Sequence, residues 1–129
     1  MNVSELRLVC DEVTLVGSRV TCDPAPTDTD QDVLCLVDLD KWPDLIEELT
    51  WDGFTFDGNE AYANALEGGC GFRSYRNGEI NLILTTDAEF HRRFIAATSV
   101  AKHLNLLNKA DRIALFQAVL YGNPMEGVL

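Results

Sequence analysis

The sequence is poor in positive charge. Its 129 residues include 10 Lys and Arg against 21 Asp and Glu, which gives a formal net charge of −11 at pH 7. A protein that binds duplex DNA or RNA without sequence preference needs a basic face that displaces counterions from the phosphates. The composition therefore argues against non-specific duplex binding. Any phosphate-bearing ligand has to be met by a few placed cations, or by metal ions held on acidic side chains.

The sequence also lacks long apolar runs and the features of a secretory leader. No stretch approaches the roughly 18 consecutive apolar residues that a membrane-spanning helix needs, so we expect no membrane partner. Arg7, Asp11 and Glu12 lie in and beside the first apolar stretch, which is untypical of a signal peptide. We therefore expect a cytoplasmic protein.

Cysteine and histidine are too few and too scattered for a typical zinc site. None of the 4 cysteines lies in a C-x-x-C pair, and only 2 histidines could join them at a metal. Free, reduced cysteines suit the cytosol. The G-x-S-x-G elbow of serine hydrolases and the Walker-type phosphate loop are also missing. Neither a Ser/His/Asp hydrolase nor a P-loop protein therefore finds support in the sequence.

What the sequence does contain is a mixture of strand and helix patterns. With 47% hydrophobic and 24% charged residues, its composition suits one domain, which we predict over residues 1–129. Apolar and β-branched runs predict strands, and apolar residues at helical spacing predict helices. The predicted strands are 13–16, 32–37, 72–76 and 79–84, with 51–56 as a further edge strand or a loop. The predicted helices are 4–12, 40–50, 59–67 and two that close the chain. This pattern indicates an α+β domain.

Local signals mark where several elements begin or turn. Asn77-Gly78 is the dipeptide expected in the turn of a β-hairpin between 72–76 and 79–84. Thr86 with Glu89 forms a capping box that opens a long helix. Its inward residues are predicted to be Phe90, Phe94, Ala97, Ala101 and Leu104. Asn108 is predicted to cap the last helix. Pro24 and Pro26 forbid regular structure in the loop before residue 30.

The residues that suggest chemistry are two carboxylates and a glycine-serine pair. Asp30 and Asp32 are two residues apart at the start of a strand, so their side chains point to the same face. Two neighbouring carboxylates repel each other unless they share a proton or a cation, and Mg²⁺ or Mn²⁺ would remove that repulsion. Gly17 permits a close approach of backbone to ligand, and Ser18 offers an N–H and a hydroxyl to a phosphate. Taken alone, an Asp-x-Asp pair more often only solubilises a loop.

The combination of these elements resembles the nucleotidyltransferase superfamily of the DNA polymerase β type. The resemblance rests on a strand that ends in Gly17-Ser18, then 11 residues, then Asp30-Gln31-Asp32-Val33. The wider phrase from Gly17 to Asp32 looks like small stand-alone members, many of them encoded by phages. The resemblance implies a minimal nucleotidyltransferase fold, a small mixed β-sheet with helices packed on it and two C-terminal helices. For a phage protein it would also imply the host cytoplasm.

The resemblance also implies roles for individual residues. Gly17 and Ser18 would hold the phosphates of a nucleoside triphosphate, and Asp30 and Asp32 would bind two divalent ions, Mg²⁺ or Mn²⁺. The reaction would be in-line attack of an acceptor hydroxyl on the α-phosphorus, with pyrophosphate leaving. The acceptor could be a small molecule, a protein or an RNA end. Arg19 follows the turn directly, and it either reaches a phosphate or is an ordinary surface arginine.

The family supplies a third carboxylate from a neighbouring strand, and two residues compete for that position here. Glu79 has the right chemistry but lies beside the predicted hairpin turn. Asn81 lies on the same face of the strand and has better apolar flanks, but it is uncharged. We favour Glu79 as the third catalytic and metal-binding residue. Arg73 and Arg76 flank the same turn and could reach over the site.

Two functions follow from this pattern. In the first, the protein moves a nucleoside monophosphate from a triphosphate to a hydroxyl. In the second, it keeps the fold with weak or lost catalysis and acts as an acidic module that inhibits or recruits a host protein. The intact Asp30 and Asp32 favour the first function. The doubtful third acid, the proline-rich loop and the net charge of −11 favour the second.

Overall fold

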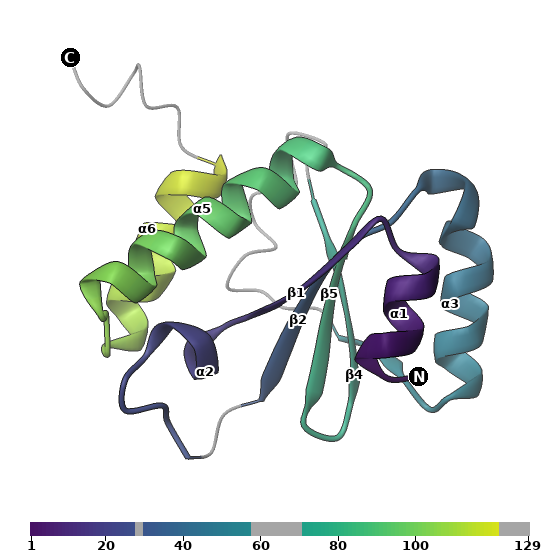
Figure 1. Ribbon diagram of the computed structural model, residues 1–129, viewed down its shortest axis with the longest axis horizontal. Coiled ribbons are helices and arrows are strands. Elements are labelled where there is room, and N and C mark those ends of the chain that lie inside the picture. Colours follow the sequence, from purple (N-terminus) through teal and green to yellow (C-terminus); the bar gives the residue numbers. More distant parts are fainter. Residues whose placement is uncertain (28–29, 58–70, 122–129) are drawn as a thin grey trace.

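The computed structural model describes residues 1–27, 30–57 and 71–121, which form a mixed β-sheet between two layers of helices (Figure 1). Within these residues the sheet has five strands in the order β1-β2-β5-β4-β3. The central strands β2 and β5 run parallel, and all other neighbours are antiparallel. The strands are β1 (Glu12–Val16), β2 (Gln31–Leu36), β3 (Thr55–Asp57), β4 (Arg73–Asn77) and β5 (Ile80–Thr85). The α+β class is thereby confirmed.

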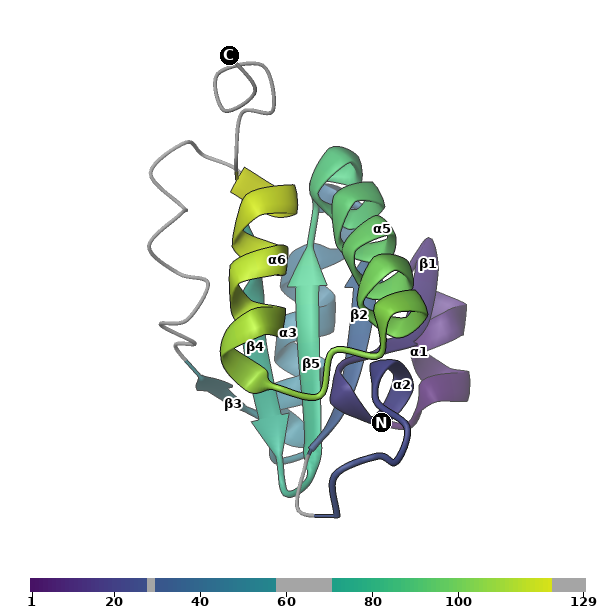
Figure 2. The same cartoon turned by 90° about the vertical axis from the view of Figure 1, so that its left-hand side faces the viewer.

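The helices cover both faces of this sheet. One face carries α1 and α3, and the other carries α5 and α6, with the short α2 beside α5 (Figures 1 and 2). None of the helices in the described part of the chain has the length and apolar character needed to cross a bilayer. Their bounds are α1 (Val3–Val9), α2 (Ser18–Thr21), the 3₁₀ turn η1 (Leu39–Lys41), α3 (Trp42–Trp51), α5 (Ala88–Leu104) and α6 (Lys109–Tyr121).

The core is divided by the sheet into two apolar clusters. Strand β2 contributes to both, because Val33 and Cys35 face one layer of helices and Leu34 faces the other. All three side chains are fully buried, as expected for a central strand whose neighbour is parallel. The cluster under α1 and α3 includes Leu6, Leu45, Leu49, Leu82 and Leu84. The cluster under α5 and α6 includes Ile83, Phe90, Phe94, Ala97, Phe116 and Leu120.

The β4–β5 hairpin is confirmed, but its turn lies one residue later than predicted. Asn77 pairs with Ile80 in the ladder, so the two residues outside the pairing are Gly78 and Glu79. Gly78 has a φ of 58°, a left-handed conformation that glycine adopts without a steric penalty. The shift places Glu79 in the turn itself, and this matters for the site.

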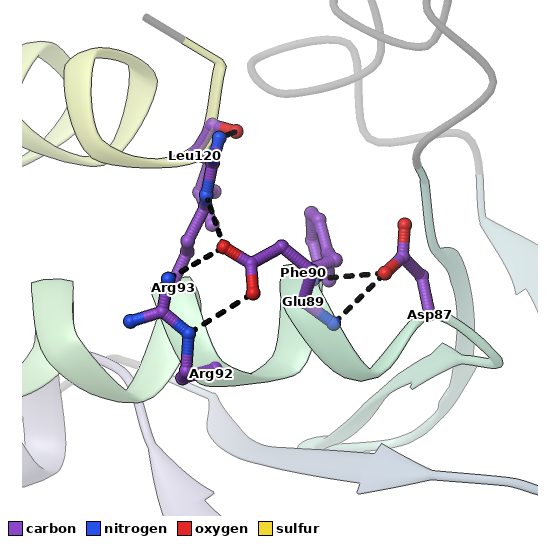
Figure 3. A network of polar contacts seen from close by, with 6 residues as sticks. All are labelled: Asp87, Glu89, Phe90, Arg92, Arg93 and Leu120. Carbon is purple, nitrogen blue, oxygen red and sulfur yellow. Dashed lines mark hydrogen bonds and ion pairs between the residues drawn. The ribbon is translucent and has the colours of Figure 1, made fainter. Parts of the chain in front are cut away.

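Two details of α5 differ from the sequence predictions. Its N-cap is Asp87 rather than Thr86, because the Asp87 carboxylate accepts hydrogen bonds from the N–H groups of Glu89 and Phe90 (Figure 3). Leu104 is 57% exposed, since it ends the helix next to Asn105, whose φ of 50° turns the chain away. The buried positions predicted before it, from Phe90 to Ala101, are confirmed. The helix predicted at 59–67 lies outside the described residues.

An exposed ion-pair network follows the start of α5. Glu89 accepts hydrogen bonds from Arg92 and Arg93, and Arg93 also donates to the carbonyl oxygen of Leu120 on α6 at 3.2 Å (Figure 3). The two guanidinium groups lower the pKa of Glu89 to about 2. The network therefore connects the two closing helices at their polar surface.

Candidate functional site

The Gly17-Ser18 turn is packed against the second aspartate. Gly17 directly follows β1 and has a φ of 82°, and Val16 before it pairs with Asp32 on β2. A Cβ atom on Gly17 would lie 2.1 Å from Asp32 Oδ2 and 2.9 Å from its Cβ. Any side chain at position 17 would therefore collide with this carboxylate and strain the backbone. The two halves of the sequence motif meet in space.

Ser18 begins α2, and this helix is one turn long. The N–H groups of Val20 and Thr21 bond to the carbonyl of Gly17 at 3.0 Å, and regular structure ends at Cys22. The helix ends before Pro24 and Pro26, in agreement with the loop predicted from these two prolines. Ser18 is half-buried and directly follows Gly17 in the chain.

A polar row crosses the sheet at the beginning of β2. Asp32 pairs in register with Asn81 on β5, and Asn81 pairs with Arg76 on β4, so all three residues share one face. Asn81 Nδ2 donates to Asp32 Oδ1 at 2.9 Å. Asn81 is only 3% exposed, and its Oδ1 has no hydrogen-bond partner among the described residues. The row therefore holds one buried oxygen that a cation or a donor could satisfy.

Asp30 is bound by Arg76, the last residue of this row. The Arg76 guanidinium reaches across β5 and forms a hydrogen-bonded ion pair with Asp30 Oδ2. Both side chains are partly exposed, at 32% and 40% respectively. Arg73, on the same strand, does not take part, since its guanidinium lies 5.5 Å from the centre of the Phe56 ring. Of the two arginines that flank the turn, Arg76 is therefore the one that reaches the site.

Glu79 does not join the two aspartates. Its side chain is 83% exposed in the β4–β5 turn and lies 3.6 Å from Arg19, whereas Asn81 occupies the ladder position beside Asp32. The reason is the register between β2 and β5, which pairs Asp32 with Asn81 and leaves Glu79 two residues before it, in the turn. Arg19 consequently faces an acid at the rim of the site. Figure 2 shows α2 and the hairpin turn at the same end of the sheet.

The electrostatics of the site reflect this crowding. Burial raises the pKa of the Asp32 carboxyl above its ordinary value, and the neighbouring charge of Asp30 acts in the same direction. The hydrogen bond from Asn81 and the charges of Arg76 and Arg19 act in the opposite direction. Ionisation of both Asp30 and Asp32 therefore costs free energy unless a cation lies between the two carboxylates.

The side-chain oxygens at this site are suitable ligands for a divalent metal ion. Among the described residues no three His, Cys, Asp or Glu side chains converge on one point. The available ligands in this part of the chain are the carboxylates of Asp30 and Asp32 together with the buried Oδ1 of Asn81. Carboxylate and amide oxygens are suitable ligands for Mg²⁺, which commonly uses one or two carboxylates and substrate phosphates. The metal-binding role of Asp30, Asp32 and Glu79 stays a prediction.

A separate cavity of about 630 Å³ opens at the other end of the sheet, near the starts of α3 and α5. Trp42, Phe72, Tyr75 and Asp87 are among its lining residues. None of the six predicted site residues, all of which the structure describes, lines it. The chemistry-bearing groups therefore lie outside this cavity, at the opposite end of the sheet.

Sequence reasoning did not assign the Asp30–Arg76 pair or the Asp32–Asn81 hydrogen bond. Both depend on β5 lying between β2 and β4, and the order of strands in a sheet is not written in a local pattern. The same-face spacing of Asn81 and Glu79 was the available signal, and it left the two residues as alternatives. The register decides which one stands beside Asp32.

No family model and no curated protein matches the sequence. Among solved structures, a cytoplasmic RNA terminal U-transferase superposes with a TM-score of 0.50 at 18% identity, over 86% of this chain and 33% of that chain. The conserved protein GrpB from Enterococcus faecalis superposes with a TM-score of 0.54 at 18% identity, over 89% of this chain and 83% of that chain. This chain spans about a third of the U-transferase and most of GrpB. It has a nucleotidyltransferase-like fold.

Proposed function

We propose that this protein is a metal-dependent nucleotidyltransferase that moves a nucleoside monophosphate from a triphosphate to a hydroxyl acceptor. The observation that carries the proposal is the contact between the Gly17 turn and the Asp32 carboxylate. A backbone that binds phosphate and a carboxylate that binds metal can act on the same triphosphate only when they lie side by side, as Gly17 and Asp32 do. The fold shared with a terminal U-transferase supports the same conclusion.

The residues have distinct tasks in this proposal. Gly17 and Ser18 bind the β- and γ-phosphates through backbone N–H groups and a hydroxyl, and Asp30 and Asp32 hold Mg²⁺ or Mn²⁺. The bound metal supplies Lewis-acid stabilisation of the phosphoryl charge and favours the ionised acceptor hydroxyl. Asn81 orients Asp32 through its amide. The carboxylates thereby position the triphosphate for in-line attack and departure of pyrophosphate.

The acceptor belongs to one of three classes in this proposal, namely a small molecule, a protein or an RNA end. The side chains of Asp30 and Arg76 are partly exposed, so a large acceptor could approach them. A location in the cytoplasm, including that of a phage-infected host, is part of the same proposal.

A second candidate is a binding module whose catalysis is weak or lost. It is favoured by the neutral Asn81 beside Asp32 and by the Arg76 guanidinium on Asp30, since both reduce the negative charge available to metal. Such a module would act on a host protein through its acidic surface.

The test is transfer of label from α-³²P nucleoside triphosphates with Mn²⁺ or Mg²⁺ to acceptors in a host lysate. The wild type is compared with Asp30→Asn/Asp32→Asn. The matched control is Glu47→Gln/Glu48→Gln, which removes the same charge from exposed positions on α3, on the other face of the sheet. We expect the aspartate variant to lose about 100-fold or more of the transfer, because paired metals stabilise most of the developing charge.

Two results would distinguish the candidates. Label in the wild type and the control, but not in the aspartate variant, supports the enzyme, and the size of the labelled product identifies the acceptor class. No transfer by any form, together with a host protein that co-purifies equally with all three, contradicts the enzyme and supports the binding module.

A further inference from the structure

Arg76 already supplies a positive charge to the first aspartate. Its guanidinium comes from β4, passes over the position of β5 and pairs with Asp30, 46 residues away in the sequence. The pair is partly buried and joins residues on opposite sides of a central strand. It is therefore a contact that the fold creates rather than a chance meeting of neighbours on a helix.

The residue between them explains why the pair can form. Asn81 lies in register between Asp32 and Arg76, and it is neutral and buried. It donates from its amide to Asp32 and leaves its Oδ1 without a partner among the described residues. An acid at this position would compete for Arg76. With an amide there, the guanidinium is directed past it to Asp30.

A guanidinium and a divalent ion cannot both occupy the same side of Asp30. Two cations at contact distance repel each other strongly where solvent is partly excluded. A divalent ion that binds Asp30 and Asp32 must therefore displace Arg76, and the displaced guanidinium needs another acid. A triphosphate offers one, because arginine pairs with phosphate as well as with carboxylate.

We infer that Arg76 is the resident counter-ion of Asp30, competes with the divalent ion for it, and transfers to a phosphate when metal and triphosphate bind together. This inference rests on the proposed function for the identity of the ligand. Metal alone binds weakly, because it breaks the Asp30–Arg76 pair without replacing it. Metal binds more tightly together with a nucleotide, because the metal then pairs with Asp30 and the displaced Arg76 pairs with a phosphate. Arg76 is accordingly a phosphate-binding residue that also makes metal binding depend on nucleotide.

The first arm of the test measures Mn²⁺ binding alone, by the loss of the free-ion signal in electron paramagnetic resonance. Arg76→Gln is expected to bind Mn²⁺ about two- to fivefold more tightly than the wild type, the range that corresponds to removal of a part-exposed ion pair. Arg73→Gln is the matched control, with the same charge change on the same strand and a guanidinium that lies over Phe56. It should leave Mn²⁺ affinity unchanged. Asp30→Asn should weaken it.

The second arm measures how far a nucleotide strengthens Mn²⁺ binding, with α,β-methylene triphosphates of adenosine and uridine as probes. The strengthening is expected to be about two- to fivefold smaller in Arg76→Gln than in the wild type, because the variant has no cation to transfer. Arg76→Lys serves as a second variant in case the glutamine variant folds poorly. A lysine keeps the charge without the planar fork, so the Mn²⁺ affinity of Arg76→Lys should lie between those of the wild type and Arg76→Gln.

The outcomes separate this inference from the proposed function. Tighter Mn²⁺ binding by Arg76→Gln supports the inference even if no form transfers label. A lack of label transfer would contradict only the proposed nucleotidyltransferase activity. Label transfer by the wild type with equal or weaker Mn²⁺ binding by Arg76→Gln overturns the inference and leaves the enzyme standing. Equal shifts in Arg73→Gln and Arg76→Gln would also overturn it, since the effect would then be one of general charge.

Discussion

Two neighbouring stretches of the same strands have opposite roles. At their beginnings, β2 and β5 place Asp32 and Asn81 side by side, with a raised pKa on the aspartate and, among the described residues, no partner for the amide oxygen. Two residues further along, on the same face, Leu34 and Ile83 are buried with Phe90 in an apolar cluster. The first pair is costly to bury, and the second stabilises the fold.

This contrast explains how the molecule tolerates its polar end. The apolar pairs hold β2 and β5 together, so the ladder stays in register although its first rung is polar. A substitution in the apolar stretch should therefore lower stability and leave the ligand chemistry of the folded protein intact. A substitution in the polar stretch should change the ligand chemistry of the folded protein and lower its stability less.

The largest expected effect is on the apolar side. Leu34→Ala should lower the free energy of unfolding by about 2–5 kcal/mol, because a fully buried side chain is replaced by a cavity. Urea denaturation followed by circular dichroism would measure it. Leu15→Ala, at a position 42% exposed on β1, is the control and should cost much less. Equal costs at the two positions would contradict this division of the strands.

The next effect is on the polar side, at the turn. Gly17→Ala should cost about 2–4 kcal/mol, since it combines a strained positive φ with a collision against Asp32. It should also weaken Mn²⁺ binding, because the Asp32 carboxylate has to move. Gly78→Ala has a similar φ but no atom within 4 Å of the new Cβ, so it should cost only about 1 kcal/mol. The difference between the two alanines, measured by urea denaturation, reports the collision together with the added backbone strain at Gly17, whose ψ is −174°.

A smaller effect is expected at Asn81, the neutral residue that pairs with Asp32. Asn81→Asp should lower stability in the absence of metal by about 1–2 kcal/mol, as it removes a hydrogen bond to Asp32 and adds a like charge. Mn²⁺ should reverse this loss and raise the melting temperature more than in the wild type, since binding to the native state stabilises it. The control is Asn108→Asp, which adds the same charge at the start of α6. A variant that Mn²⁺ stabilises no better than the wild type would contradict the view of Asn81 as a potential ligand position.

Much of this fold follows from short-range patterns in the sequence. The central strand at β2, the hairpin and the two closing helices are predictable because alternation, turn residues and helical spacing are local signals. The errors are local as well. Asp87 rather than Thr86 is the N-cap of α5, because its carboxylate lies one residue nearer the first free N–H groups. The hairpin turn consists of Gly78 and Glu79 instead of Asn77 and Gly78.

The site was less accessible to prediction. The resemblance assigned Gly17 and Asp32 to one nucleotide site, and the structure places the two residues in contact. The pair between Arg76 and Asp30 could not be predicted, since it requires the strand order and the exact register across β5. The register between β2 and β5, which no local pattern fixes, decides that Asn81 rather than Glu79 stands beside Asp32.

The smallest expected effect concerns Glu89, whose side chain is exposed, unlike that of Asp32. The hydrogen bonds from Arg92 and Arg93 lower the pKa of Glu89 from 4.5 to about 2. The folded protein thus binds this proton less readily than the unfolded chain, so the network stabilises the fold above about pH 4.5 and its contribution disappears as the pH falls toward 2. Glu89→Gln should be slightly less stable than the wild type at pH 6, and the difference should shrink on acidification. Urea midpoints of the two proteins between pH 6 and pH 2.5 would show it. High salt should reduce the difference at pH 6, because exposed ion pairs are screened. A difference that stays constant with pH would mean that Glu89 acts through packing or helix propensity instead of charge.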